Sequence, residues 1–414
     1  MSLLSKKTSI STHPHRFLFL NILFIACLAG IATDIYAPSL SAIALSMRAP
    51  ISKVQLSLSI FMVGLALSQL VYGPLSEGLG RRYPLLIGLI IFVCASIFCA
   101  MSTSINMLIL GRFLQGLGAG ASSSLWRSVF RDIYQGDELA KYGSYLSIII
   151  VFMLPAVPIL GGYLQHYIGW QAAFYVLIVF GMVTLFLLLS TFKETSKHHH
   201  KDRLKRPFII QSFRQLLTSR IFIGYAICVF FSYGAFFSWI TIGPVLLIKT
   251  IGLTPVEFGW VSFGMGSIAM ASASALNGRL VVHFGSQCML RFGWITMCVS
   301  GLLLLLGQSL LGVNLYGVLL PVFMFYFGVT FIWPNAFSGA FTPFGHIAGY
   351  AGALYGFLQL AGAAIIGSIA AHLPSESSLS IGIIFILSPL SAWIVYETMV
   401  NKKSKSSQNK DSRI

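Results

Sequence analysis

Charged side chains are scarce in this sequence. Asp, Glu, Lys and Arg together supply 9% of the 414 residues, whereas soluble domains usually carry about 25%. Hydrophobic residues make up 56%, and the mean hydropathy is +0.83. The chain is therefore predicted to be a polytopic membrane protein. Its net charge of +16 does not indicate nucleic-acid binding, because the basic residues lie mostly in short segments between apolar runs, where orientation signals are found.

Motifs for catalysis, metals and cofactors are also lacking. The six cysteines lie in or beside apolar runs and form no C-x-x-C pair, so they are interpreted as small core residues. The histidine triplet 198–200 has no partner cysteine or carboxylate cluster and is interpreted as solvated loop rather than a metal site. The sequence has no H-E-x-x-H, G-x-S-x-G or P-loop motif. We therefore expect no enzyme, no cofactor and no ATP hydrolysis.

Apolar runs of about 20 residues, which can cross a hydrocarbon core of roughly 30 Å, occur twelve times. They are expected at 17–38, 53–75, 84–102, 106–127, 141–163, 170–192, 220–246, 256–278, 288–308, 313–336, 347–371 and 379–398. All 27 Lys and Arg residues except Arg48, Lys53, Arg112 and Lys249 then fall on one side of the membrane. Because positive loops mark the cytoplasmic side, both termini are predicted to be cytoplasmic.

A basic connector at 193–219 divides the spans six and six. The predicted organisation is a cytoplasmic arm at 1–16, two six-helix halves at 17–192 and 220–398, and a cytoplasmic tail at 399–414.

The two halves are similar at one point. The segment 73–80, with glycine at both ends and leucine at its third position, recurs at 278–285, at a constant offset of 205 residues. A six-plus-six duplication follows from this offset. Parallel repeats of this kind build transporters whose halves rock about a central site.

One acidic side chain lies well inside a span. Asp34 is near the outer end of the first span, whereas Glu397 lies at a helix end. A carboxylate costs roughly 2.5–3.5 kcal/mol at a bilayer centre, so Asp34 is a functional candidate. Arg112, in the fourth span, is expected at a similar depth. An arginine favours an ionised carboxylate and burial favours the neutral form, and a group that takes up and releases a proton needs this competition.

The connection between the second and third spans reads GPLSEGLGRR from Gly73. Glycine allows close backbone approach or a positive φ, and arginines suit the cytoplasmic headgroup layer. The pattern G-x-L-x-acid-x-x-G-R-R resembles the signature loop of the major facilitator superfamily, with glutamate in place of the usual aspartate. The resemblance implies a conformational gate made by Gly73, Glu77, Gly80, Arg81 and Arg82, in which the acid pairs with cytoplasmic helix ends.

Two further motifs are similar to those of proton-coupled drug antiporters. R-x-x-Q-G-x-G-A, which begins at Arg112, resembles a fourth-helix motif whose arginine influences protonation of a nearby acid. P-x-x-G-G resembles the fifth-helix antiporter motif, which marks export, and involves Pro155, Pro158, Gly161 and Gly162. A kink with close helix packing explains the same residues without a function.

The stretch 34–40 reads D-x-Y-x-P-x-L and resembles the signature of bacterial Bcr/CflA-type multidrug antiporters. The segments 131–134, 193–195 and 243–244 also look like that group. The resemblance covers about residues 17–397 and implies an all-α major facilitator fold with twelve transmembrane helices. It also implies that Asp34 and Arg112 couple transport to protons.

The substrate cavity is harder to assign, because aromatic residues in membrane proteins more often serve packing or interfacial belts. The offset of 205 maps Asp34 onto Trp239, which suggests an aromatic second half of the cavity. Candidate cavity residues are Tyr36, Gln115, Tyr233, Phe236, Trp239, Trp333, Asn335 and Gln359.

The function expected from these residues is proton-coupled export of small amphipathic molecules across the bacterial inner membrane. One titrating acid suggests roughly one proton per cycle. The expected partners are a small-molecule substrate, protons and membrane lipids, with the chain acting as a monomer. Export of a single endogenous metabolite, such as a siderophore, amino acid or sugar, is an alternative. A transport-dead membrane sensor is disfavoured by the short loops.

Overall fold

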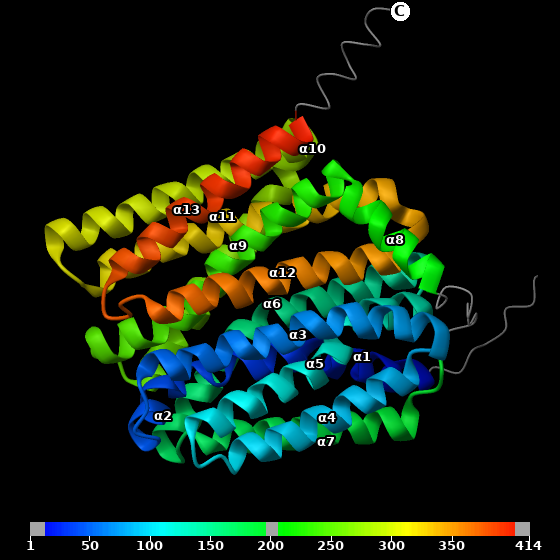
Figure 1. Cartoon of the computed structure of the whole chain (residues 1–414), viewed down its shortest axis with the longest axis horizontal. Coiled ribbons are helices and arrows are strands. Elements are labelled where there is room, and N and C mark those ends of the chain that lie inside the picture. Colours follow the sequence, from blue (N-terminus) through cyan, green and yellow to red (C-terminus); the bar gives the residue numbers. More distant parts are fainter. Residues whose placement is uncertain (1–12, 196–205, 402–414) are drawn as a thin grey trace, which may run out of the picture.

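A computed structural model describes residues 13–195 and 206–401 (Figure 1). These residues form helices and no β-strand, which confirms the prediction of an all-α chain. The helices are α1 (His13–Asp34), α2 (Leu40–Ser46), α3 (Ile51–Leu79), α4 (Arg82–Ala100), α5 (Ile105–Ile133), α6 (Gly136–Tyr167), α7 (Gln171–Thr191), α8 (Arg206–Thr218), α9 (Arg220–Pro244), α10 (Pro255–Leu311), α11 (Leu315–Phe341), α12 (Ala348–His372) and α13 (Ser378–Tyr396).

Ten helical segments of the described chain are long and apolar enough to cross a membrane. One of them, α10, spans 57 residues and is interrupted at Gly285, which has a non-helical φ of 75° and ψ of 161°. It therefore provides two spans. The 29-residue α5 is as long as α3 but carries arginine, glutamine, serine and many glycines, so it is less apolar. With α5 added and α10 counted twice, the helices match the twelve spans that the sequence predicts.

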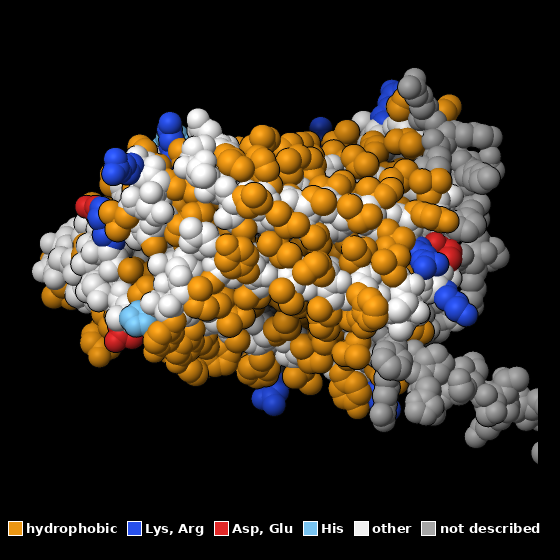
Figure 2. Space-filling model, turned by 90° about the horizontal axis from the view of Figure 1, so that it is seen from below, with side chains coloured by type: hydrophobic (Ala, Val, Ile, Leu, Met, Phe, Trp, Pro, Cys, Tyr) orange, Lys and Arg blue, Asp and Glu red, His pale blue; other side chains and the backbone are white. Residues whose placement is uncertain are grey.

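The long helices lie side by side along the long axis of the molecule (Figure 1). One end of this bundle, called here the terminal end, holds the start of α1 and the last described residue, Asn401. The other end, called the opposite end, holds α2 and the turn between α12 and α13. Hydrophobic side chains cover the middle of the face in Figure 2, and charged side chains gather mainly towards the two ends. This surface matches a multi-pass membrane protein.

Four helices that start at the opposite end are capped by polar residues of short turns. The side chains of Ser104, Thr254, Asn314 and Ser377 each accept a hydrogen bond from a backbone N–H in the first turn of α5, α10, α11 and α13. Such caps satisfy backbone donors that have no partner within the helix.

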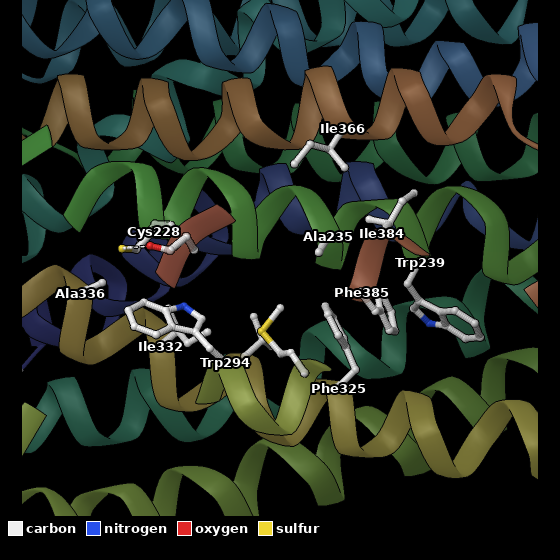
Figure 3. Packing of buried hydrophobic residues seen from close by; sticks show 14 of the residues in the cluster. Cys228, Ala235, Trp239, Trp294, Phe325, Ile332, Ala336, Ile366, Ile384 and Phe385 are labelled. Atoms are coloured by element: carbon white, nitrogen blue, oxygen red, sulfur yellow. Dashed lines mark hydrogen bonds between the residues drawn. The ribbon is translucent and has the colours of Figure 1, made fainter. Parts of the chain in front are cut away.

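Two large clusters of buried residues form the cores, and a third, small cluster consists of Ala273, Met289 and Phe331. The first draws on α1–α7 and also includes Phe237, Ala363 and Ala364 from later in the chain. The second is built from residues between 216 and 400. In the second, the rings of Phe325 and Phe385 stack with centroids 3.6 Å apart (Figure 3). For brevity, residues 13–195 are called the first half and residues 206–401 the second half.

The connector between the halves contains an unexpected helix. α8 packs its apolar face on the second half: the rings of Phe208 and Phe213 each lie 5.7 Å from that of Tyr350, and Leu216 is fully buried. With Ile209, which packs on the same core, Phe213 and Leu216 recur at i, i+4 and i+7, the spacing of an amphipathic helix. The histidine triplet, most of the N-terminal arm and the tail beyond residue 401 lie outside the described residues.

The repeated glycines adopt one backbone conformation. Gly80 ends α3 with φ 87° and ψ 175°, and Gly285 has φ 75° and ψ 161°. Only glycine visits this region readily. The offset of 205 residues therefore relates two turns with the same geometry.

Candidate functional site

Asp34 is the last residue of α1. The chain turns at Ile35 and Tyr36 and then forms a short 3-10 segment, Ala37–Ser39, which begins beside Pro38. Proline fixes φ and suits the first turn of a helical segment. A Cβ added at Gly161 of α6 would overlap the carbonyl oxygen of Ile35, so glycine lets α6 pack directly on this break. The break leaves Asp34 at a helix end inside the protein.

Asp34 is half-buried. It lies within electrostatic range of Tyr233 on α9 and Tyr326 on α11. Across the described residues, Asp34 forms neither an ion pair nor a hydrogen bond through its side chain. This carboxylate therefore has polar neighbours in the second half but no fixed partner.

Arg112 of α5 is fully buried behind α1. Its Nη1 donates to the carbonyl oxygen of Ala32 at 3.1 Å and to Oε1 of Gln115 at 2.5 Å. The guanidinium carbon lies 4.1 Å from the ring centroid of Phe61 and 4.9 Å from that of Tyr36. Nε and Nη2 have no hydrogen-bond partner among the described residues. Arg112 thus contacts the backbone two residues before Asp34 and not the Asp34 carboxylate.

Gln115 and Tyr36 belong to the first core rather than to the surface that faces the second half. Gln115 is fully buried and donates through Nε2 to Oγ of Ser96 at 2.7 Å. Tyr36 is also fully buried, with its hydroxyl 2.9 Å from Oγ of Ser57 and its ring 5.5 Å from that of Phe174.

Three predicted cavity residues of the second half form one aromatic cluster. The ring centroids of Tyr233, Phe236 and Trp333 lie 5.4–5.8 Å from one another. Tyr326, which the sequence analysis did not single out, packs 5.3 Å from Phe236. This cluster is half-buried, except for Tyr326, and it lies on the side of α9 and α11 that approaches Asp34.

The other predicted cavity residues are more deeply buried or lie on other helices. Trp239 is 2% exposed and belongs to the second core, where its side chain interacts with that of Tyr326 (Figure 3). Asn335 is 4% exposed and donates to Oδ1 of Asn277 at 2.8 Å. Gln359 is half-buried on α12, between Gly356, which faces α3, and Gly362, which faces α9.

At the terminal end, Glu77 joins the two halves. Its carboxylate lies against Gly349, in the first turn of α12, where a Cβ would overlap Oε1. One turn earlier on α3, Gly73 faces Ala353. A helix N-terminus favours negative charge, so the carboxylate stabilises the contact between α3 and α12.

The rest of the predicted gate holds the first half together. The Glu194 carboxylate accepts the backbone N–H groups of Arg81 at 2.9 Å and Arg82 at 3.1 Å. The side chain of Arg81 forms an ion pair with Asp132 at 3.1 Å. Glu194 occupies the place that a Cβ at Gly80 would take. Glycine is therefore required there for two reasons, its positive φ and this contact.

The glycines of the fifth-helix motif in α6 contact both halves of the chain. Gly161 faces Ile35, as described, and a Cβ at the adjacent Gly162 would overlap the carbonyl oxygen of Pro255 at the start of α10. On α10, Gly259 faces Pro158 and the backbone of the next residue in α6. The halves therefore meet here through backbone atoms.

A hydrogen-bonded contact between the halves also closes the opposite end. Gln55 of α3 is fully buried, and its Nε2 donates to the carbonyl oxygen of Thr241 and to Oγ of Ser375, both at 2.9 Å. A surface cavity of about 380 Å³ borders Gln55, but its lining does not include Asp34.

The contact between α6 and α10 does not continue to the terminal end. A Cβ added at Gly278 or Gly285 would meet no neighbouring atom of the described chain within 4 Å. The two halves therefore meet at the opposite end through α3, α6 and their partners, and at the terminal end mainly through α3 and α12.

Two residues near the site were missed from the sequence, Tyr326 and Arg127. Tyr326 lies seven residues before Trp333, a helical spacing that could have found it. Arg127, interpreted as an orientation signal, lies within electrostatic range of Tyr233 and of Tyr355 on α12. Within the described ranges, no group of three His, Cys, Asp or Glu side chains could hold a metal ion.

Comparison with known proteins places the chain among transporters. The family model described as the Major Facilitator Superfamily matches residues 22–368. The uncharacterized MFS-type transporter YdgK of Bacillus subtilis is 33% identical over 351 residues, 84% of this chain and 86% of that protein. The bicyclomycin resistance protein homolog of Haemophilus influenzae is 29% identical, over 87% of this chain and 91% of that protein.

Two further matches extend over most of the chain. Multidrug resistance protein D of Escherichia coli is 26% identical, over 94% of this chain and 98% of that protein. The crystal structure of a D-xylose-proton symporter superposes with a TM-score of 0.70 at 15% identity, covering 92% of this chain and 97% of that one. At this identity the structural match shows the fold alone.

Proposed function

Because the chain belongs to the major facilitator superfamily, we propose that it exports small amphipathic molecules across the bacterial inner membrane in exchange for protons. Relatives named as bicyclomycin and multidrug resistance proteins support this class of substrate. The antiporter motif in α6 supports export rather than import. The transporter acts as a monomer surrounded by lipid, without a cofactor.

The observation that carries the proposal is the position of Asp34. It ends α1 at a break in the helix, faces Tyr233 and Tyr326 of the second half, and has no fixed partner among the described residues. When the halves move, the surroundings of this carboxylate change between water and protein, and each environment favours a different protonation state. A substrate bound between the halves competes with the proton for the same place.

Arg112 acts on Asp34 through the backbone. Its guanidinium donates a hydrogen bond to the Ala32 carbonyl, two residues before Asp34, and stacks on the ring of Tyr36, two residues after it. A buried arginine whose Nε and Nη2 have no hydrogen-bond partner among the described residues contributes positive potential to the end of α1. This potential opposes the effect of burial on the carboxylate, so protonation stays reversible.

Alternating access follows from two half-molecules at 17–192 and 220–398 that rock against each other. Basic loops at the terminal end support its assignment to the cytoplasm. In that orientation the close contacts of Gln55 and Gly162 belong to a closed outer end. Glu77 at the start of α12 is then the cytoplasmic gate, and it opens when the halves separate at the terminal end.

Transport assays in proteoliposomes test the proposal. Wild-type chain should export an amphipathic solute only when a pH gradient is imposed. Asp34→Asn should lose this gradient-driven accumulation while still exchanging labelled for unlabelled solute, because binding and rocking need no proton in the variant. Asp137→Asn, an exposed acid in the first turn of α6, is the matched control and should behave like wild type.

Gradient-driven export at the wild-type rate in the Asp34 variant would rule out this residue as the proton site. Competition across a panel of solutes then separates the substrate classes. Inhibition by many unrelated solutes supports drug export, and inhibition by one metabolite alone would replace it with dedicated metabolite export.

A further inference from the structure

The connector helix α8 carries two apolar surfaces, of which the described chain covers one. Ile209, Phe213 and Leu216 pack on the second core. Ile210 and Leu217, seven residues apart and therefore on one face of the helix, are 65% and 56% exposed. We call these two side chains the open stripe. An exposed apolar stripe on a short helix with polar neighbours indicates a partner outside the chain.

The level of α8 in the membrane is set by α9, which follows after one residue. That residue, Ser219, accepts a hydrogen bond from the backbone N–H of Phe222 and caps α9. From Ile221 onward α9 is predominantly apolar, so the hydrocarbon core begins within its first turns. α8 therefore lies at the terminal end, level with the lipid headgroups, beside α12 and the start of α9 (Figure 1).

Two arginines flank the open stripe. Arg214 lies between Ile210 and Leu217 along α8, and Arg220 begins α9. Both arginines are exposed, and neither forms an ion pair with an acid within the described ranges. In helices of this kind the apolar side chains enter the acyl region while the arginines extend to the headgroups. Because a guanidinium matches the oxygens of a phosphate, the charge favours anionic phospholipids.

The covered surface of α8 supports the contact between the two halves. The rings of Phe208 and Phe213 pack edge-on against that of Tyr350, which is 2% exposed. The residue before it, Gly349, is the one against which the Glu77 carboxylate lies. α8 thus packs on the first turn of α12 at the point where α12 meets α3.

We propose that α8 is a docking surface for anionic phospholipids in the leaflet at the terminal end. Ile210 and Leu217 enter the acyl region, and Arg214 and Arg220 bind the lipid phosphates. Held in this way, α8 keeps the first turn of α12 against Glu77. The inference goes beyond the proposed export function and does not depend on it, because it requires only that the chain is embedded in a bilayer.

Native mass spectrometry of the full chain measures the docking directly. The protein in detergent is titrated with phosphatidylglycerol or with phosphatidylcholine of the same acyl chains, and wild type should bind the anionic lipid more tightly. Arg214→Gln combined with Arg220→Gln should weaken that binding about fivefold for each arginine removed. Lys141→Gln combined with Arg279→Gln, exposed residues of α6 and α10 at the same end, is the matched control and should keep wild-type affinity.

Amide hydrogen exchange in nanodiscs tests where the lipid acts. In wild type, discs of phosphatidylglycerol should slow the exchange of α8 and of residues 348–352 relative to discs of phosphatidylcholine. The double arginine variant should lose this difference and keep wild-type exchange in phosphatidylcholine, which verifies that α8 is folded. Ile210→Ser combined with Leu217→Ser should speed the exchange of α8 in both discs, because both lipids offer the same acyl chains.

Equal affinity of wild type for the two lipids, or the same loss in the control pair as in the arginine pair, would overturn the docking. If soluble glycerol phosphate slowed the exchange of α8 in phosphatidylcholine discs, the arginines would bind a free phosphate and not a lipid. Slowed exchange confined to α8 would overturn the link to α12. Gradient-driven export is measured separately, so the proposed function stands or fails independently of these results.

Discussion

At the scale of single residues, Tyr36 and Tyr233 illustrate two uses of the same side chain. Tyr36 is fully buried and its hydroxyl bonds to Ser57, so it stabilises the first core. Tyr233 is half-buried, belongs to the aromatic cluster and lies near both Asp34 and Arg127. Removing one oxygen atom from each tests which of them meets the substrate.

Tyr36→Phe should lower the free energy of unfolding by about 1 kcal/mol and leave KM unchanged, because one internal hydrogen bond is lost. Tyr233→Phe should leave stability unchanged and alter KM and the dependence of transport on pH. Thermal unfolding midpoints and transport kinetics measure the two effects. A change of KM in the Tyr36 variant, with none in the Tyr233 variant, would reverse the assignment.

Gly80 and Gly285 distinguish two reasons why glycine is required at a position, a positive φ and a close contact. Both have a positive φ, but Gly80 also contacts the Glu194 carboxylate, whereas Gly285 has open space. Gly285→Ala should destabilise the chain by about 1–3 kcal/mol through backbone strain alone. Gly80→Ala should cost more, because it also displaces Glu194 from the N–H groups of Arg81 and Arg82. Unfolding midpoints compare them, and equal losses would contradict a role for the contact.

At the scale of helices, the contact of α6 with α10 depends on glycine. Gly162 faces Pro255 and Gly259 faces Pro158, so backbone meets backbone where the halves approach. Small residues at helix crossings allow such close approach in membranes. Any added carbon must push the two helices apart at the opposite end.

Gly162→Ala should therefore weaken the closed arrangement of the opposite end. Overpacking costs about 1–3 kcal/mol, which changes a two-state population by roughly 5–150-fold. Spin labels at the exposed positions Tyr167 and Trp260 should show a longer distance. Gly278→Ala, on α10 with open space around it, is the control and should keep the wild-type distance. An unchanged distribution in the Gly162 variant would show that this contact does not hold the end closed.

The helices also show which elements can be predicted from the local sequence pattern. Spans were predicted because long apolar runs have one explanation in a membrane protein. α8 was missed because only one side of it is apolar and basic residues surround it in the sequence. The recurrence of Ile209, Phe213 and Leu216 at i, i+4 and i+7 was the pattern that could have revealed it.

Orientation beyond a helix end could not be predicted. The helical period fixes directions only while the helix continues, and α1 stops at Asp34. The direction of Tyr36, two residues later, is therefore set by tertiary packing on Ser57 and Phe174. Arg127 posed a different problem, because its location at a basic helix end already had an explanation. Its neighbours come from the second half, whose placement the sequence does not reveal.

At the scale of the whole molecule, Gln55 joins the halves at the opposite end. Gln55→Leu removes three hydrogen bonds, the two that Nε2 donates to the Thr241 carbonyl and to Oγ of Ser375, and the one that Oε1 accepts from the Ser375 hydroxyl. The closed arrangement should lose about 1–3 kcal/mol. Spin labels at Met101 and Leu311, both exposed, should report a larger population of long distances. Lys53→Gln, an exposed residue on the same helix, is the control, and the same shift in both variants would contradict a specific role for Gln55.

The two separate cores have a consequence for the order of events during synthesis. Apart from Phe237, Ala363 and Ala364, the buried residues of the first cluster have all been made once residue 192 leaves the ribosome. At about 5–20 residues per second, the rest of the chain takes on the order of ten seconds or more. Helices α1–α7 therefore have time to insert and pack before their partners exist, and the nascent chain should acquire its structure in two stages.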